Sequence, residues 1–193
     1  MEASRIVGVL IALILIVGGV GAFIFVRVSN TASQAVVVDQ NDAQQLLQAV
    51  MDIDGIGAIS SPHDLMHHMS NVLTALYSDK LEMDALFTEV IRIHRLLFTQ
   101  NALALNPFDT QHQNFMAQLV HHRSAGVFQT DIQVVDIIPS DPGYAWAHLS
   151  QTFQNLGTVK WVYYLVYEDG WKVETRFPAN ENFEPFITNV VNQ

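Results

Sequence analysis

The sequence of 193 residues contains no cysteine, which excludes disulfide bonds, thiolate metal sites and cysteine nucleophiles. Basic residues are also scarce, with 9 Lys and Arg against 19 Asp and Glu and a net charge of −10 when histidine is neutral. This balance disfavours binding to nucleic acid or to an anionic membrane surface. A Gly-rich phosphate loop, a G-x-S-x-G elbow and an HExxH motif are absent from the sequence as well. We therefore predict a protein that is not an enzyme, with no cofactor, no metal and no nucleic-acid partner.

One long apolar run is present. Residues 6–26 carry no charge, and the run ends at Arg27. A helix of about 20 apolar residues can cross the hydrocarbon core of a bilayer, so the run predicts a transmembrane helix in contact with lipid. A cleaved secretory signal is the alternative, but its apolar region is shorter and a small-x-small site follows it closely. Here the nearest such site is at residues 33–35, so length favours a retained anchor.

The basic residues that flank the run hardly distinguish between the two possible orientations in the membrane, because Arg5 lies on one side and Arg27 on the other. The next basic residue after Arg27 is Lys80, whereas cytoplasmic segments next to a membrane usually carry Lys or Arg. We therefore expect a single-pass protein of the cell membrane with residues 1–5 in the cytoplasm and the rest of the chain extracytoplasmic. Small residues spaced four apart in the run leave a homodimer through this helix possible.

The chain after the run has the composition of a tether followed by one domain. Residues 27–41 are small and polar around a short Val stretch and are interpreted as a linker. Residues 42–193 are numerous enough to bury a core without disulfides. Residues 29–193 hold 7 of the basic and 18 of the acidic side chains, a net charge of −11. The acidic residues are scattered, which is typical of a solubilising surface.

The spacing of apolar residues changes within this domain from a helical period to a period of two. Ser61-Pro62-His63-Asp64 is the strongest helix start, because Ser caps a helix, Pro fits the first turn and Asp favours the positive end. The spacing predicts helices at about 42–53, 62–77, 79–103 and 109–122, and strands at 129–138, 143–153, 158–167 and 171–177. Turn residues separate the strands, and a last apolar patch at 183–190 is either a short helix or a flexible end.

Helices followed by antiparallel strands predict an α+β fold with the helices packed on one face of a curved sheet. The last hairpin reads YLVYEDGWKV at residues 164–173. The order of elements over about residues 63–177, together with this Asp-Gly-Trp-Lys stretch, resembles the NTF2-like superfamily. With its anchor the chain is similar to uncharacterised single-pass proteins of the bacterial cell envelope that carry such a domain. The resemblance implies a cone of helices and sheet around a cavity.

The resemblance leaves three functions open, because NTF2-like domains serve as enzymes, ligand pockets and assembly modules. The first is a membrane-anchored extracytoplasmic module that binds a protein partner, a second copy or a small ligand without catalysis. The second is a small cyclase, isomerase or hydrolase with its active site in the cavity. The third is an assembly component of a secretion or conjugation apparatus. Enzymes of the family usually have an Asp–His pair or a Tyr in the cavity, and no such pair is matched here, so we expect the first.

The pairing of the strands selects the candidate site. With Asp169-Gly170 as a two-residue loop, Val166 lies opposite Val173, and with a turn at 154–157, Leu149 lies opposite Val162. One face is then mostly aliphatic and is expected to pack on the helices. The other face mixes aromatic and titratable side chains, which are typical of interfaces and of pocket linings, although strand propensity alone also favours aromatics. The candidate ligand- or partner-binding residues are Trp146, His148, Trp161, Tyr163, Glu174 and Arg176.

The chain has eight histidines. His63 and His67 are one helical turn apart, a spacing that can hold zinc, but further ligands at a set spacing are missing. Both fall opposite the apolar stripe of their helix and are expected to be exposed, with His68 at the edge of the stripe. Because histidine titrates near pH 6.5, we expect a pH response of the external domain rather than a metal site.

Overall fold

The computed structural model describes residues 40–55, 57–80 and 85–184. The predicted anchor at 6–26 and most of the predicted linker lie outside these residues. Among the described helices, none combines the length and apolar character that a membrane span requires. The elements, in chain order, are α2 (Gln40–Met51), the 3-10 helix η2 (Asp52–Gly55), α3 (Pro62–Tyr77), α4 (Ala85–Leu96), α5 (Gln100–Leu105), α6 (Phe108–Ser124), β1 (Gln129–Pro139), β2 (Tyr144–Phe153), β3 (Gly157–Tyr167) and β4 (Trp171–Ala179).

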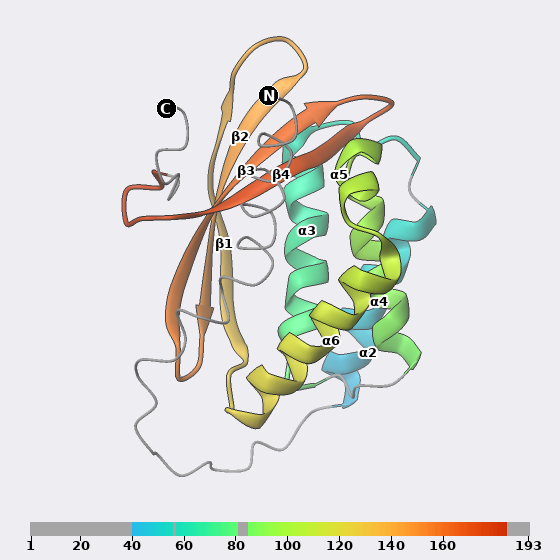
Figure 1. Ribbon diagram of the computed structural model, residues 1–193, viewed down its shortest axis with the longest axis vertical. Coiled ribbons are helices and arrows are strands. Elements are labelled where there is room, and N and C mark those ends of the chain that lie inside the picture. Colours follow the sequence, from blue (N-terminus) through green and yellow to red (C-terminus); the bar gives the residue numbers. More distant parts are fainter. Residues whose placement is uncertain (1–39, 56, 81–84, 185–193) are drawn as a thin grey trace, which may run out of the picture.

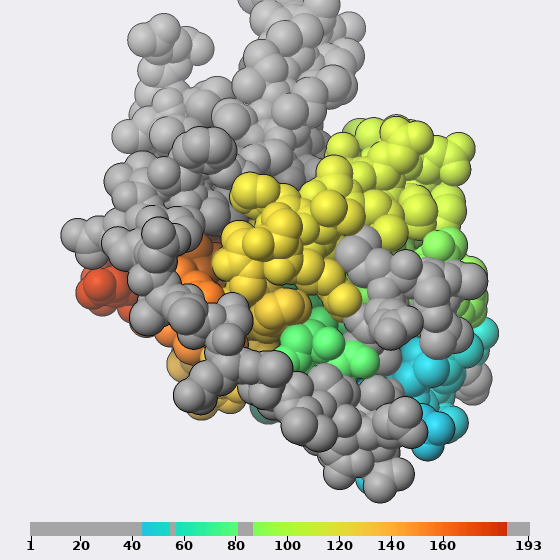
Figure 2. Space-filling model, turned by 90° about the horizontal axis from the view of Figure 1, so that it is seen from below, coloured from blue at the N-terminus to red at the C-terminus, as the bar shows by residue number. Residues whose placement is uncertain are grey.

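The four strands form one antiparallel meander in the order β1-β2-β3-β4. The sheet is strongly twisted, and the described helices all lie on one side of it, with α3 next to the strands (Figure 1). Seen from below, α6 (yellow) occupies the surface between the orange strands and the yellow-green α5 (Figure 2). The prediction of an α+β fold with helices on one face of a curved antiparallel sheet is confirmed.

The central helix α3 begins where its capping residues predict. The Ser61 hydroxyl accepts a hydrogen bond from the Asp64 backbone N–H at 3.1 Å, and Pro62 is the first helical residue. Its apolar stripe is buried between the sheet and the other helices, and the residues are Leu65, Met66, Met69, Val72, Leu73, Ala75, Leu76 and Tyr77. Burying a Leu or Met side chain contributes about 2 kcal/mol, so this stripe is a large part of the core.

The single helix predicted over about 79–103 is wrong, because the chain leaves the helix after Leu96 and starts α5 only after Thr99. The intervening residues pair with the free edge of β4. The Val173 N–H donates to the Leu97 carbonyl at 2.8 Å, and the Thr99 N–H donates to the Val173 carbonyl at 3.0 Å. Unpaired edge groups of a sheet are costly when buried, so these long-range bonds override the local helical preference.

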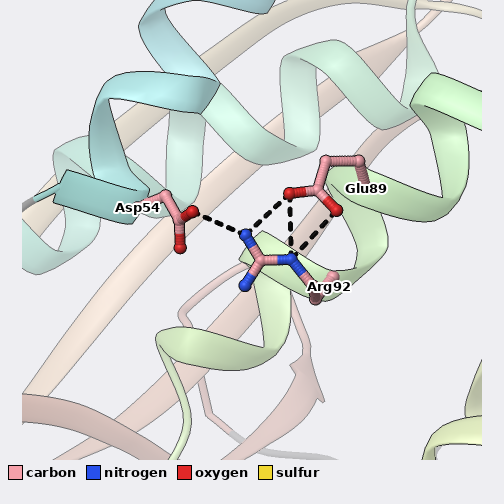
Figure 3. Close-up of polar contacts among 3 residues, drawn as sticks. All are labelled: Asp54, Glu89 and Arg92. Atoms are coloured by element: carbon pink, nitrogen blue, oxygen red, sulfur yellow. Dashed lines mark hydrogen bonds and ion pairs between the residues drawn. The ribbon is translucent and has the colours of Figure 1, made fainter.

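Two contacts tie the residues between α2 and α3 to the rest of the fold, one from α4 and one from the turn between β3 and β4. Arg92 of α4 contacts Asp54 of η2 at 2.8 Å and Glu89 of its own helix at 2.7 Å (Figure 3). At the β3–β4 turn, the Trp171 N–H donates to the Ile59 carbonyl at 2.9 Å. A Cβ at Gly170 would lie 2.8 Å from the Ile59 nitrogen, so only glycine fits where this turn packs on the segment before α3.

Candidate functional site

The pairing of β2 with β3 differs by one residue from the prediction. Leu149 lies opposite Trp161, and Ala147 lies opposite Tyr163. The turn causes the difference, because Asn155 adopts φ 63° and Gly157 adopts φ 90°, which brings Phe153 opposite Gly157. A shift of one residue moves every side chain of a strand to the other face. Trp161 and Tyr163 therefore lie on the face that packs on the helices.

The pairing of β3 with β4 is predicted correctly only away from the turn. Tyr164 lies opposite Thr175 as predicted, but an irregularity between Tyr164 and Leu165 shifts the rest by one residue. Leu165, and not Val166, therefore faces Val173. The reason is the loop, which has three residues between Tyr167 and Trp171 instead of two, and a bulge in β4 absorbs the extra residue.

The six candidate residues do not share one face, and this part of the prediction is wrong. We call the helix-covered side of the sheet the inner face and the opposite side the outer face. Trp161, Tyr163 and Arg176 lie on the inner face, whereas Trp146 and His148 lie on the outer face. Glu174 is at the bulge, where its carboxylate accepts hydrogen bonds from the Thr99 hydroxyl and the Asn101 amide beside α5.

Arg176 is the charged group of the inner face. Its guanidinium carbon lies 4.6 Å from the centroid of the Trp161 ring, and Nη1 donates to the Tyr163 hydroxyl at 3.5 Å, the limit of a hydrogen bond. Within the described residues Arg176 makes no ion pair, although its side chain is half-buried. Burial lowers the pKa of Arg176, but Tyr163 and Tyr77 raise it by more, so the net shift is upward and the charge is retained.

The helix opposite Arg176 contributes a buried histidine. His94 of α4 is 1% exposed, and its ring centroid lies 4.9 Å from that of Phe98 and 5.4 Å from that of Phe115. Burial, followed by the charges of Arg176 and Arg95, lowers the pKa of His94 to about 3. The imidazole is therefore neutral at physiological pH, with one donor and one acceptor nitrogen.

Several buried polar atoms around these residues have no hydrogen-bond partner in the described part of the chain. They are both ring nitrogens of His94, both ring nitrogens of His122, and the indole nitrogen of Trp161. His122 of α6 lies 5.7 Å from the Tyr77 ring, and burial lowers the pKa of His122 and raises that of Tyr77. An unsatisfied buried polar group costs about 1–3 kcal/mol, so a concentration of them calls for a functional explanation.

Comparison with protein-family models, with curated proteins and with solved structures finds no match. The geometry of the two faces is therefore what supports any assignment of function.

The polar groups of the outer face are paired with one another. The His148 Nδ1 lies 2.6 Å from a carboxylate oxygen of Asp136, and the His148 ring stacks on Phe183 at 4.7 Å. Tyr144 and Tyr164 stack with 5.9 Å between centroids, and Trp146 packs on Tyr164 at 4.6 Å. The Asp136–His148 geometry is that of an acid–base pair, but it lies on the side of the sheet away from the helices.

The histidines of α3 lie as predicted. His63 and His67 are exposed, and His68 is half-buried at the edge of the apolar stripe. Among the residues that the structure describes, no group of three or more His, Asp or Glu side chains is placed to hold a metal ion.

Three residues beside the two faces were missed by sequence reasoning, namely His94 of α4, Tyr77 of α3 and Asp136 of β1. His94 could have been found, because it lies four residues after Val90 and four residues before Phe98, in the apolar stripe of the predicted helix. A titratable residue in a buried stripe is a signal for a perturbed site. Asp136 gave no such signal, since its partner His148 becomes a neighbour only through the β1–β2 pairing.

Proposed function

We propose that the protein is a membrane-anchored, extracytoplasmic module with an NTF2-like domain that binds a small ligand at the inner face and does not catalyse a reaction. One observation carries the proposal. Within the described part of the chain, a guanidinium without a carboxylate partner lies on the inner face beside buried polar nitrogens that also have no partner there. Buried polar groups without hydrogen bonds lower the stability of the ligand-free protein. A bound ligand that supplies the missing acceptors and donors would remove this cost.

The aromatic character of the inner face supports a ligand rather than a reaction. Binding sites are mostly apolar with a few well-placed polar groups, and here rings of Trp161, Tyr163, Tyr77 and Phe115 surround Arg176 and His94. A reaction by acid–base catalysis needs a group that titrates near neutral pH. His94, with a pKa of about 3, is a neutral imidazole and only a weak base at that pH.

Ligand binding is tested with the full chain reconstituted in nanodiscs of uncharged lipid. Native mass spectrometry of the purified protein identifies small molecules that remain bound, and a thermal-shift screen with small organic molecules finds those that stabilise it. We expect ligands whose effect disappears in a variant with a bulky inner face, Ala147→Phe, and persists in Ser150→Phe, its counterpart on the outer face. Ligands that are equally affected by both variants would contradict an inner-face site.

The proposed topology has its own test, which the absence of cysteine simplifies. Single cysteines are introduced at Ser4 and at Glu181, an exposed residue of the domain, and intact cells are treated with a membrane-impermeant maleimide. Labelling of the Glu181→Cys variant alone, with both labelled after permeabilisation, is the expected result. Labelling of Ser4→Cys alone in intact cells would reverse the orientation.

The Asp136–His148 pair supports a second candidate, a hydrolytic enzyme whose site is on the outer face. A His oriented by a carboxylate at 2.6 Å can act as a general base. Chromogenic ester and phosphoester substrates test this candidate. Turnover that Asp136→Asn reduces by about 100-fold or more would favour it over the binding module, whereas turnover that is absent, or equal in the variant, would not.

A further inference from the structure

We infer that the ligand of the inner face is a small carboxylate with a single negative charge and an apolar body, held through its carboxylate by Arg176. This inference rests on the proposed function and names the class of ligand that the same site takes. It depends on three properties of the site, which are the free donors of Arg176, the count of charges around it, and the rings that border it.

The donors of Arg176 are arranged for a planar anion. One face of the guanidinium lies over the Trp161 ring at 4.6 Å, so ligand atoms approach along its edge. A guanidinium has five N–H donors, and the described residues use only one of them, in the 3.5 Å contact with the Tyr163 hydroxyl. A carboxylate accepts two parallel N–H bonds from such an edge, a geometry that a lysine cannot reproduce.

The charges around Arg176 favour an anion with one charge rather than two. Among the residues that the structure describes, the titratable groups that shift the pKa of Arg176 are Tyr163 and Tyr77, and no carboxylate is among them. Glu174, two residues away on the same strand, is held by Thr99 and Asn101. His94 adds no charge at neutral pH, and Arg95, which also lowers the pKa of His94, donates to the Asn106 carbonyl and to the Gln111 side-chain oxygen. A single positive charge in a low-dielectric setting is balanced by a monoanion, whereas a phosphate dianion would leave an uncompensated charge.

The rings beside Arg176 favour an apolar or aromatic body. Trp161 is 4% exposed, and its indole N–H has no partner in the described residues. On α4, the ring of His94 is near enough to Arg176 for that charge to lower its pKa, has no hydrogen-bond partner in the described residues, and is flanked by Phe98 and Phe115. The Trp161 indole and the His94 ring thus offer two hydrogen-bonding groups among aromatic side chains. Such a lining fits a ligand whose remaining part is mostly apolar and carries one small polar substituent.

The test uses the full chain in nanodiscs of uncharged lipid. Trp146→Phe and Trp171→Phe are introduced together, so that Trp161 is the only fluorophore of the three tryptophans in the chain. Benzoate and octanoate are the probes, and benzamide, octanamide and phenylphosphonate are the comparison compounds. We expect saturable changes of Trp161 fluorescence with the carboxylates at concentrations at least about tenfold lower than with the amides or the phosphonate.

Variants of Arg176 complete the test. Arg176→Met keeps an unbranched chain beside Trp161 and is expected to weaken carboxylate binding by about tenfold or more, without change for the amides. Arg176→Lys keeps the charge and is expected to lose part of the affinity, since it lacks the bidentate edge. Lys160→Met on the outer face is the matched control and should bind as the parent does. The comparison of carboxylate with amide is made in the Trp146→Phe/Trp171→Phe protein with Arg176 unchanged, so a folding defect in Arg176→Met leaves the test decisive.

Three results would overturn the inference. Equal binding of carboxylates and amides, insensitive to Arg176→Met, would remove the carboxylate but leave an inner-face ligand site intact. Tighter binding of phenylphosphonate than of benzoate would replace the monoanion with a dianion. If no probe changes the fluorescence of Trp161, both the carboxylate ligand and the proposed binding at the inner face would be rejected.

Discussion

The two faces of the same sheet treat their polar groups in opposite ways. On the outer face, which no described helix covers, His148 is paired with Asp136, and Lys160 donates to the Glu181 carbonyl at 2.8 Å. Between the inner face and the helices, Arg176 has one marginal hydrogen bond and the buried Trp161 and His94 nitrogens have none in the described residues. Unpartnered polar groups cost most where they are buried.

This contrast is the reverse of what stability alone would produce. A core selected only for stability would place aliphatic side chains at these positions, as it does at Ala145, Ala147 and Leu149 on the neighbouring strand. Local conflicts with packing rules concentrate at functional sites in natural proteins. The difference between the faces therefore indicates where a functional site lies, and the following variants test it.

Two adjacent tyrosines provide the largest expected contrast. Tyr163 is fully buried on the inner face, whereas Tyr164 is half-buried on the outer face. We expect Tyr163→Ala to lower the free energy of unfolding by about 3–5 kcal/mol and Tyr164→Ala to lower it by about 1 kcal/mol. Urea unfolding of the full chain in detergent micelles, followed by circular dichroism, measures both. Equal losses would mean that the pairing of β3 places its side chains differently.

The pH dependence of stability depends on the buried histidine. The pKa of His94 is about 3 in the folded protein and about 6.5 in the unfolded chain, so the unfolded chain binds more protons between these values. Stability is therefore complete above about pH 6.5 and falls as the pH decreases towards 3. We expect His94→Phe to recover about 2 kcal/mol of unfolding free energy at pH 5 relative to pH 8.

The control for this prediction is His67→Gln, which changes an exposed histidine of α3. Unfolding is measured for the parent and both variants at pH 5 and pH 8. His122 contributes in the same direction, because burial also lowers its pKa, so part of the dependence persists in His94→Phe. A pH dependence that His67→Gln reduces and His94→Phe leaves unchanged would place the response on the surface.

Removal of the inner-face charge should stabilise the free protein. A methionine at position 176 packs beside Trp161 and Tyr163 without a desolvated charge, so we expect Arg176→Met to raise the free energy of unfolding by about 1 kcal/mol. Lys160→Met, the outer-face control, should change it by less than about 0.5 kcal/mol. Thermal melting of the ligand-free proteins makes the comparison. A destabilised Arg176→Met would show that the guanidinium supports the fold.

The smallest effect is expected on the outer face. Asp136 is half exposed, and ion pairs in contact with solvent contribute about 0–1 kcal/mol. His148→Gln should therefore lower the free energy of unfolding by less than about 1 kcal/mol, measured by the same melting experiment at pH 7. Asp136→Asn should have an effect of similar size. A loss of about 3 kcal/mol would show that this side of the sheet is buried in the intact protein.

Much of the fold could be predicted from local signals. Ser61 and Pro62 set the start of α3, and the change to a period of two located all four strands within two residues at each end. The break between α4 and α5 could not be predicted, because it exists for hydrogen bonds with Val173, a residue more than 70 positions later. The candidate site was predicted only in part. Arg176, Tyr163 and Trp161 were named, but they were grouped with residues that lie on the other face.

The α+β order of elements, the acidic and cysteine-free character of the chain, and the expectation of an anchor at 6–26 all follow from the amino-acid sequence alone. These properties depend on composition and on spacing between near neighbours. Which aromatic side chains lie on the inner face is known only from the tertiary structure. That choice depends on one residue of register at the turn before Gly157 and on the bulge of β4. Strand faces alternate at every residue, so this single step brings Trp161 and Tyr163 to Arg176 on the helix-covered side.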